Sequence, residues 1–430
     1  MWPGALAHSK ACLLTDQTTD TREPSDPPLF GWYLGGQATW FSSIGLQMVL
    51  FAWLVTDVLD ERAFRVGLAQ TALMAPSLLF MIFGGAFADR SDTRAVLIRL
   101  HCAAAIPPLA LALIIFSGEL RYEWLIVYGL IMGTLSAFAI PARDSLLSTV
   151  AAKAFGADIQ RAVTMASGVQ FMGQLGGIIV AGAAAVTGAP ALLALQSVVM
   201  ISGAVMVRRL PPAPPLDREP SHPLADMRDG VSQVASSPIL LPVVLGMFAV
   251  GVLYVGSFMV LLPLLVTNYY DGGASGISLV NICFWGGTII ATFALLRFGH
   301  IHRRGLIMTC SLSSGAVILF LIGVPAPFWV MCALCFIWGL GAGTSMTMSR
   351  TIVQLAAPPT HRARVLSIFQ LGFAGGGPIG AFATGFVVEL TSIHQAAWIS
   401  AGTMVLVLLV LAATTRLVSI TSDDVAPATA

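Results

Sequence analysis

Long stretches without a charged residue alternate with short polar segments along most of the chain. Ten charge-free runs are present, at residues 27–56, 66–88, 100–118, 124–142, 162–207, 230–270, 272–296, 305–349, 365–388 and 390–415. An apolar helix needs roughly 20 residues to cross a bilayer, so each run is long enough for at least one membrane span.

Turn signals divide two of these runs. Residues 162–207 and 305–349 are double length, and they are interrupted by Thr187–Pro190 and Val324–Pro327. Glycine and proline at these points would break a continuous helix. Residues 230–270 begin with a polar stretch, which we interpret as a surface segment before a single span. The pattern therefore predicts an all-α membrane protein with twelve transmembrane helices.

The amount and placement of charge support a membrane protein. Of the 430 residues, 57% are hydrophobic and 10% are charged, whereas a soluble domain usually contains about 25% charged residues. Arg62, Arg65 and Arg121 fall on one side of the predicted bilayer, and the other 19 of the 22 basic residues fall on the opposite side. The positive-inside rule then places both termini in the cytoplasm. A net charge of +1 gives no reason to expect a nucleic acid partner.

The spans fall into two groups of six. The predicted order is a cytoplasmic tail at 1–29, a six-helix bundle at 30–209, a cytoplasmic linker at 210–237, a second bundle at 238–416 and a cytoplasmic tail at 417–430. Prolines are expected to make the linker semi-rigid. Four acidic residues in the first tail argue against a signal peptide, and we expect residues 1–29 and 421–430 to be disordered.

The two groups also repeat each other in sequence. Arg143 is predicted to end the fourth span and Arg350 the tenth. The pair Gly176-Gly177 corresponds to Gly376-Gly377 at a similar offset. Parallel six-helix repeats with a site between them are typical of secondary transporters.

One loop gives the chain a family resemblance. Between the second and third spans stands Gly85-Ala-Phe-Ala-Asp89-Arg90-Ser-Asp92-Thr-Arg94. This run resembles the loop signature of the major facilitator superfamily, G-x-x-x-D-R-x-G-R-R/K, at the same place in the fold. It departs from the signature at Asp92 and at the following threonine. The resemblance covers about residues 30–416 and implies two pseudo-symmetric six-helix halves that transport a substrate by alternating access.

A narrower resemblance points toward export. The run Ala137-Phe-Ala-Ile-Pro-Ala-Arg143-Asp-Ser looks like the enterobactin-exporter-like branch, which also holds macrolide-efflux-like proteins. It implies export of a siderophore or a hydrophobic antibiotic across a bacterial inner membrane. An importer or uniporter is the alternative, and a non-transporting sensor is a further one. The spans contain no cluster of His, Asp, Glu and Cys residues that would suggest an enzyme.

The loop also suggests a gate. In the family, the loop aspartate lies against the start of the eleventh helix, where free N–H groups favour an anion. Asp89 would then stabilise the outward-open state, while Arg90 and Arg94 would pair with Asp144. The expected gating set is Gly85, Asp89, Arg90, Arg94, Arg143 and Asp144. The alternative is an ordinary solvated loop that is basic for topology.

Polar and aromatic residues inside spans suggest where a substrate binds, because such groups tend to face a cavity. The candidates are Gln37, Trp40, Gln47, Gln170, Gln174, Tyr254, Phe258, Asn281 and Trp285. Together they predict a large amide-and-aromatic pocket for a bulky amphiphile. For each of them, bonding between helices is the rival interpretation.

Few residues are candidates for coupling transport to a source of energy. No charged residue lies at the centre of a span, and Asp57, Asp144 and Glu389 stand near span ends. Proton antiport through one of these carboxylates is the favoured hypothesis, with uniport as the alternative. His101 is interpreted as structural, with proton movement as its alternative role. The chain contains no GxxxxGK[ST] loop for ATP. A monomer in a lipid bilayer is expected, with no cofactor and no metal.

Overall fold

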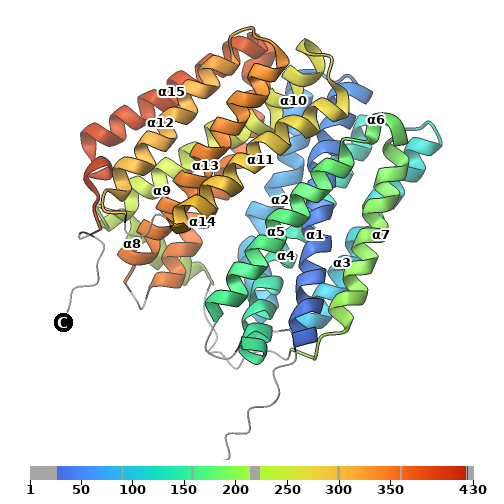
Figure 1. The fold of residues 1–430 in the computed structure, drawn as a ribbon, viewed down its shortest axis with the longest axis horizontal. Helices are drawn as coiled ribbons and strands as arrows, with labels where there is room; N and C mark the ends of the chain where they lie inside the picture. Colours follow the sequence, from blue (N-terminus) through green and yellow to red (C-terminus); the bar gives the residue numbers. More distant parts are fainter. Residues whose placement is uncertain are drawn as a thin grey trace, which may run out of the picture.

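A computed structural model describes residues 27–89, 91–155, 159–213, 223–297, 301–358, 361–422 and 424. In this part of the chain, 12 helices are long and apolar enough to cross a membrane, which confirms the predicted number. Figure 1 shows them as two bundles that lie side by side and diverge toward the end where the chain termini lie.

The first half contains six of these spans. Its elements are α1 (Pro27–Trp53) with the π-helical turn η1 (Leu54–Val58), α2 (Ala63–Asp89), α3 (Thr93–Phe116), α4 (Tyr122–Phe155), α5 (Ile159–Ala181), the short α6 (Ala184–Thr187) and α7 (Ala189–Arg208). Gly188, with φ of 80°, separates α6 from α7 at the predicted break. Such a backbone angle is readily available only to glycine.

The second half repeats this order. Its first span joins α9 (Leu240–Ala249), η2 (Val250–Val255), η3 (Ser257–Leu261), α10 (Leu262–Leu264) and η4 (Leu265–Tyr269). It continues with α11 (Gly273–Arg297), α12 (Arg304–Ile322), α13 (Phe328–Ala356), α14 (Arg362–Leu390) and α15 (Ile393–Thr414). The first span of each half ends in a π-helical turn, which agrees with the repeat seen in the sequence.

Two helices are longer than expected. Arg143 and Arg350 lie inside α4 and α13 and do not end them. No glycine or proline lies between Arg143 and the end of α4 at Phe155, or between Arg350 and the end of α13 at Ala356, so nothing stops either helix at its arginine. Both arginines are therefore held on rigid helical backbone.

The linker contains a helix that its prolines did not suggest. This helix, α8 (Pro223–Ser236), packs against the start of α14. The two are joined by an ion pair of Arg364 with Asp229 at 3.2 Å, and Gly230 lies directly over the α14 backbone. The start of α14, where Asp89 was expected to dock, is thus also a contact site for α8.

The end of the chain is partly ordered, contrary to the expected disordered tail. The turn η5 (Leu417–Ser419) leads to Ile420, whose carbonyl accepts from the Gly305 N–H at 3.0 Å. Ser422 donates its backbone N–H to the His302 carbonyl at 2.7 Å. The backbone N–H and hydroxyl of Thr421 donate to the Asp424 carboxylate and lower its pKa. Of the predicted tail at 1–29, residues 1–26 lie outside the described residues, and residues 27–29 belong to α1.

The halves meet at one end of the molecule. We call the end where α1 begins the terminal face, and the opposite end the far face. At the far face α2 crosses α14 so closely that a Cβ on Gly67 would lie 2.9 Å from the Gly385 Cα. Beside this crossing, the Ser278 hydroxyl of α11 donates to the Ile178 carbonyl of α5 at 2.7 Å. The two halves are therefore packed together at the far face.

Candidate functional site

A cavity of about 260 Å³ lies in the second half, on the side turned toward the first. Six aromatic residues line it, Tyr254, Phe258, Phe284, Trp285, Trp338 and Phe373. Four methionines complete its apolar wall, Met74, Met247, Met259 and Met346. Met74 comes from α2, so a residue of the first half closes the cavity. Among the described lining residues none carries a charge.

The aromatic residues support one another. Trp338 makes edge contacts with Tyr254, Phe258 and Phe284, at ring centroid distances of 5.6, 6.0 and 5.7 Å. The Tyr254 hydroxyl is already used, because it donates to the Leu312 carbonyl at 2.6 Å. Edge-to-face rings fix each other's orientation. This wall is therefore preformed and apolar.

Two polar atoms near the cavity have no partner. The indole N–H of half-buried Trp285 is buried and donates to no described group. One turn earlier on α11, the Asn281 side chain donates to the Ile277 carbonyl at 2.8 Å, while its Oδ1 accepts no hydrogen bond. A buried polar atom without a partner is uncommon. Because Trp285 lines the cavity, its indole N–H offers one donor to a ligand there.

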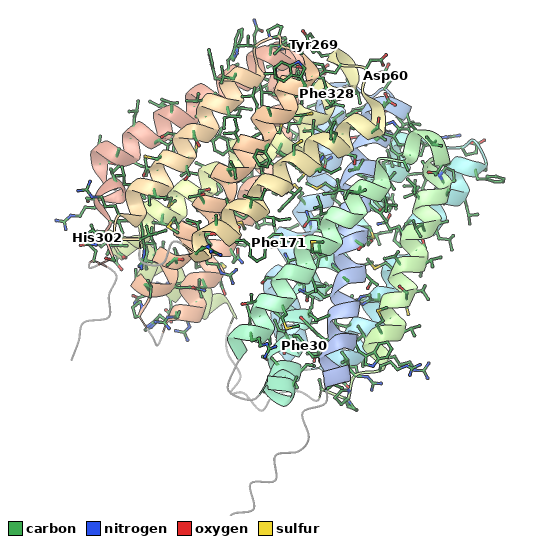
Figure 2. All side chains as sticks on the ribbon, viewed as in Figure 1. Phe30, Asp60, Phe171, Tyr269, His302 and Phe328 are labelled. Atoms are coloured by element: carbon green, nitrogen blue, oxygen red, sulfur yellow. The ribbon has the colours of Figure 1, made fainter. Side chains whose placement is uncertain are left out.

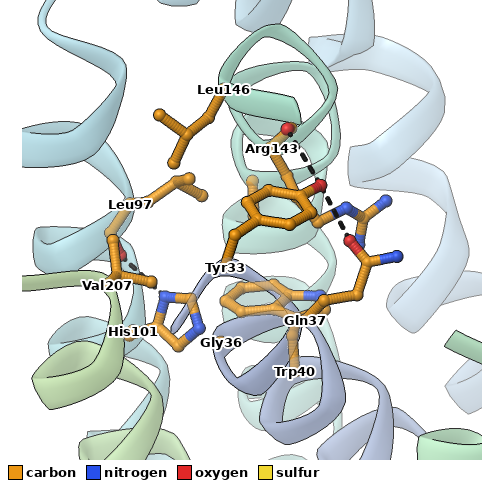
Figure 3. Close-up of a pocket in the computed structure, with 10 residues that line it drawn as sticks. Tyr33, Gly36, Gln37, Trp40, Leu97, His101, Arg143, Leu146 and Val207 are labelled. Carbon is orange, nitrogen blue, oxygen red and sulfur yellow. Dashed lines mark hydrogen bonds between the residues drawn. The ribbon is translucent and has the colours of Figure 1, made fainter. Parts of the chain in front are cut away.

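A second, much smaller cavity of about 10 Å³ lies inside the first half (Figure 3). Its walls come from α1, α3, α4 and α7, and they include Tyr33, Gln37, Trp40, His101 and Arg143. Figure 3 shows the Tyr33 hydroxyl next to Gln37 Oε1, to which it donates at 2.8 Å. The Gln37 amide in turn donates to the Ala166 carbonyl of α5 at 2.8 Å. Both side chains are therefore engaged within the bundle.

Three other groups at this cavity have unsatisfied atoms. Trp40 Nε1, His101 Nε2 and Arg143 Nη1 are all buried without a hydrogen-bond partner. The Arg143 guanidinium stacks over the Phe41 ring at 4.5 Å and pairs with exposed Asp144 at 3.6 Å. The sequence analysis gave His101 a role in proton movement only as an alternative. It could not show that His101 lies together with Trp40 and Arg143 at this cavity.

The motif loop is anchored to its own half. Asp92, which departs from the family pattern, caps α3 by accepting from the N–H groups of Arg94 and Ala95. Its carboxylate also accepts from the Ala213 N–H at 3.2 Å. The Arg94 guanidinium donates to the Arg208 carbonyl at 2.6 Å and forms no ion pair with Asp144 in this arrangement. The predicted Arg94–Asp144 pair is thus absent here, because each partner is engaged elsewhere.

The gating aspartate is only partly described. Gly85 and Asp89 belong to the last turns of α2, and Arg90 lies outside the described residues. Contact between Asp89 and the start of α14 therefore stays a prediction.

The structure separates the predicted substrate residues into groups. Tyr254, Phe258 and Trp285 line the larger cavity. Gln37 and Trp40 instead line the small cavity. Asn281 stands one turn from Trp285 without lining either cavity. The larger cavity therefore contains aromatic candidates without the amide candidates, and the role of all of them as substrate contacts stays a prediction.

The remaining amide candidates lie in the first half. Gln47 accepts a hydrogen bond from the Tyr128 hydroxyl at 3.3 Å, which joins α1 to α4. Gln174 is buried where α5 packs on α1, and its carbonyl lies against Gly45. Gln170 is half-buried, one turn earlier on α5. Figure 2 shows the neighbouring Phe171 on the side of α5 that faces the second half.

The three proton-coupling candidates also have different surroundings. Asp57 accepts from the Trp53 indole at 2.6 Å within α1 and η1. Glu389 pairs with Arg62, so this ion pair joins α14 to the loop before α2 at the far face. Asp144 faces Arg143 on its own helix, and Arg350 of α13 acts on it electrostatically from the other half.

Twelve spans in two repeated halves, with a lined cavity at their interface, define a membrane transporter of the major facilitator superfamily. A family model described as a transmembrane secretion effector matches residues 33–430. The chain belongs to this family.

Characterised relatives are similar over most of their length. Macrolide efflux protein A of Streptococcus pyogenes is 23% identical, over 84% of this chain and 90% of that protein. Enterobactin exporter EntS of Citrobacter koseri is 24% identical, over 76% of this chain and 77% of that protein. Multidrug efflux pump Tap of Mycolicibacterium fortuitum is 25% identical, over 81% of this chain and 87% of that protein.

Solved structures share the fold. The nucleoside transporter NupG superposes with a TM-score of 0.72 at 15% identity, over 90% of this chain and 98% of that one. A bacterial homologue of the lysosomal transporter Spinster superposes with a TM-score of 0.61 at 12% identity, over 91% and 96%.

Proposed function

We propose that this protein exports lipophilic small molecules from the bacterial cytoplasm across the inner membrane. The observation that carries the proposal is the larger cavity, whose described lining is aromatic and methionine-rich without a charge. Burying an ionised group there without a partner would be costly. Flexible methionines adapt to ligands of different shape. A hydrophobic antibiotic therefore fits this cavity better than a siderophore with several charges.

The unpartnered Trp285 indole N–H narrows the class of compounds proposed for transport. A compound whose apolar body fills the cavity would accept a hydrogen bond from it. A site that hydrogen-bonds its ligand discriminates strongly against analogues that lack the matching group. We expect transported compounds to combine a large apolar surface with at least one acceptor near one end.

The arrangement of the halves supports alternating access. The excess of basic residues on that side supports a cytoplasmic position for the terminal face. Because the halves are packed together at the far face, this arrangement corresponds to the inward-open state. The proposed gating set acts at the cytoplasmic side, where Asp89 docks on the start of α14 in the outward-open state and Arg90 and Arg94 pair with Asp144.

Proton antiport is the proposed energy source. Glu389, Asp144 and Asp57 are the candidate carboxylates, and two of them already form ion pairs whose partners could exchange with a proton. Import or uniport is the second candidate, and the direction of transport separates it from export.

Variants of Trp285 test the cavity. In an efflux-deficient bacterium that expresses the protein, Trp285→Ala should lower resistance to lipophilic antibiotics, because truncating a buried aromatic contact costs about 2 kcal/mol. Trp285→Phe should have a smaller effect. The control is Trp329→Ala, since Trp329 is on α13 and 70% exposed. Resistance is measured against a panel of macrolides and dyes, together with export of a catecholate siderophore. A protein that exports only the siderophore would contradict the proposed cargo. An equal loss of resistance in Trp329→Ala would contradict the proposed role of Trp285.

A further inference from the structure

Three arginines stand at the terminal face of the first half without an acidic partner. Arg99 lies near the start of α3, and Arg208 and Arg209 lie where α7 ends; all three are exposed. None of them forms an ion pair with a described residue. The carboxylate of Asp92, on the adjoining loop, already accepts from three backbone N–H groups. Uncompensated positive charge therefore collects at this corner of the molecule.

The ends of three helices are held together at the same corner. The Arg209 guanidinium lies over the ring of exposed Trp32 on α1, 5.4 Å from its centroid. The Arg94 guanidinium, at the start of α3, donates to the Arg208 carbonyl at 2.6 Å. The end of α7 is thereby fixed beside α1 and α3, and its two arginine side chains project from a defined position.

Both α3 and α7 continue from their arginines into exposed apolar stripes. Residues three and four apart share one face of a helix. The exposed residues on these faces are Cys102, Ile106, Leu109 and Leu113 of α3, and Val198, Ile201 and Val205 of α7. Figure 1 shows α3 and α7 on the side of the first half that is turned away from the second half. The stripes therefore face the bilayer.

The arginines stand at the depth of the lipid headgroups. Arg208 is the last residue of α7. Arg99 is six residues from the first residue of α3, which is about 9 Å along the helix axis. A long arginine side chain reaches the interface from this depth. Positive charge at the headgroups and apolar surface along the chains together match the two parts of a phospholipid.

The second half provides an internal comparison for the end of α7. Arg416 stands 207 residues after Arg209, the same spacing that separates Arg143 from Arg350. Arg416 acts electrostatically on the Asp424 carboxylate, whereas no described acid pairs with Arg209. The equivalent arginine of the second half thus has an acidic neighbour within its own chain.

The other two arginines have no counterpart in the second half. Cys310 is the seventh residue of α12, as Arg99 is of α3, and Thr415 takes the place of Arg208. The positive-inside rule applies equally to both halves. It therefore does not explain why the arginines gather at one corner of one half.

We propose that this corner binds the headgroup of an anionic phospholipid in the leaflet at the terminal face. Guanidinium groups form charge-assisted, often bidentate hydrogen bonds with phosphate oxygens, and basic pockets between helices bind such headgroups. The phosphate bridges Arg99 of α3 and Arg208 of α7, with Arg209 and Trp32 beside it, and the acyl chains lie along the two stripes. The site is separate from the cargo cavity and acts whatever the cargo.

Native mass spectrometry of the purified protein tests the selectivity. In an equal mixture of phosphatidylglycerol and phosphatidylethanolamine, the protein should retain mainly phosphatidylglycerol. The triple variant Arg99→Gln/Arg208→Gln/Arg209→Gln should lower this retention about tenfold or more, since each arginine near the headgroups contributes about fivefold. The matched control removes three arginines from the same end of the second half, Arg297, Arg303 and Arg416. Equal retention of the two lipids, or an equal loss in the control, would overturn the proposal.

Competition separates a lipid from a soluble phosphate. Excess glycerol 3-phosphate carries the same phosphate chemistry without acyl chains. It should leave most of the phosphatidylglycerol bound, because the buried chains contribute to the affinity. Complete displacement would assign the corner to a soluble anion and overturn the lipid assignment.

Photocrosslinking locates the lipid on the unsubstituted protein, so it does not depend on the folding of the variant. The protein is placed in nanodiscs with phosphatidylglycerol that carries a diazirine in its acyl chain, and crosslinked peptides are identified. Crosslinks should concentrate several-fold on residues 102–113 and 198–205, relative to the equivalent stretches of α12 and α15. An even distribution over these four helices would contradict the site.

Discussion

At the scale of single residues, polar side chains inside the spans have two different roles. Gln37 and Tyr33 satisfy each other and the α5 backbone, so they stabilise the first half. Trp285, which lines the larger cavity, keeps its indole N–H free. Residue type and spacing predict both kinds equally, because the distinction depends on whether a backbone carbonyl of another helix lies within reach.

A substitution of Gln37 separates these roles. Gln37→Leu should lower the free energy of unfolding by about 1–3 kcal/mol, because the Ala166 carbonyl loses its donor and Tyr33 loses its acceptor. Transport per folded molecule should be unchanged. Thermal unfolding in detergent and drug resistance normalised to the amount of protein measure the two effects. Gln170→Leu is the matched control and should have the smaller effect on stability. A full loss of transport without a loss of stability would make Gln37 a substrate contact.

At the scale of elements, helix crossings decide which face of the transporter is closed. Gly67 of α2 and Gly385 of α14 approach each other at the far face, where a Cβ on Gly385 would lie 2.8 Å from the Gly67 Cα. The Arg62–Glu389 pair stands near this crossing, but Arg62 is 81% exposed. An exposed ion pair contributes little stability. The glycine crossing is therefore the main contact that we expect to hold the far face shut.

Alanine at this crossing should open the far face. Gly385→Ala would disfavour the closed packing by roughly 1–3 kcal/mol, as overpacking does. That is enough to shift a two-state equilibrium several-fold or more. Spin labels at the exposed far-face positions Val58 and Tyr269, in a background without the native cysteines, should report a longer distance. Gly402→Ala is the control, because a Cβ on Gly402 would meet nothing within 4 Å. Equal distances in the two variants would refute this role.

At the scale of the whole molecule, the two halves differ despite their repeated helices. The cavity proposed for cargo is lined mainly by the second half, whereas the much smaller cavity lies wholly in the first. Asp144 of the first half and Arg350 of the second interact electrostatically across the interface. In the proposed cycle, cargo and proton act on one equilibrium between two packings of the halves.

Sequence alone predicted the architecture but only part of the site. Charge-free runs and the breaks at Gly188 and at Val324–Pro327 were sufficient for twelve spans, because the length of a membrane helix is set by the bilayer. The four-residue spacing of Tyr254 and Phe258 found one wall of the larger cavity. Met74 and Trp338 were missed, since helices that are apolar on all sides do not show in their periodicity which face meets a cavity. The helix α8 was missed because the prolines before it dominated the interpretation.

Inside-out membrane vesicles give the most direct test of export through the larger cavity. With a proton gradient generated by ATP hydrolysis, vesicles that contain the protein should accumulate radiolabelled erythromycin. A protonophore should abolish the accumulation, and Trp285→Ala should reduce it about thirtyfold, the equivalent of about 2 kcal/mol. Accumulation only in right-side-out vesicles, or accumulation that Trp285→Ala leaves unchanged, would contradict the account.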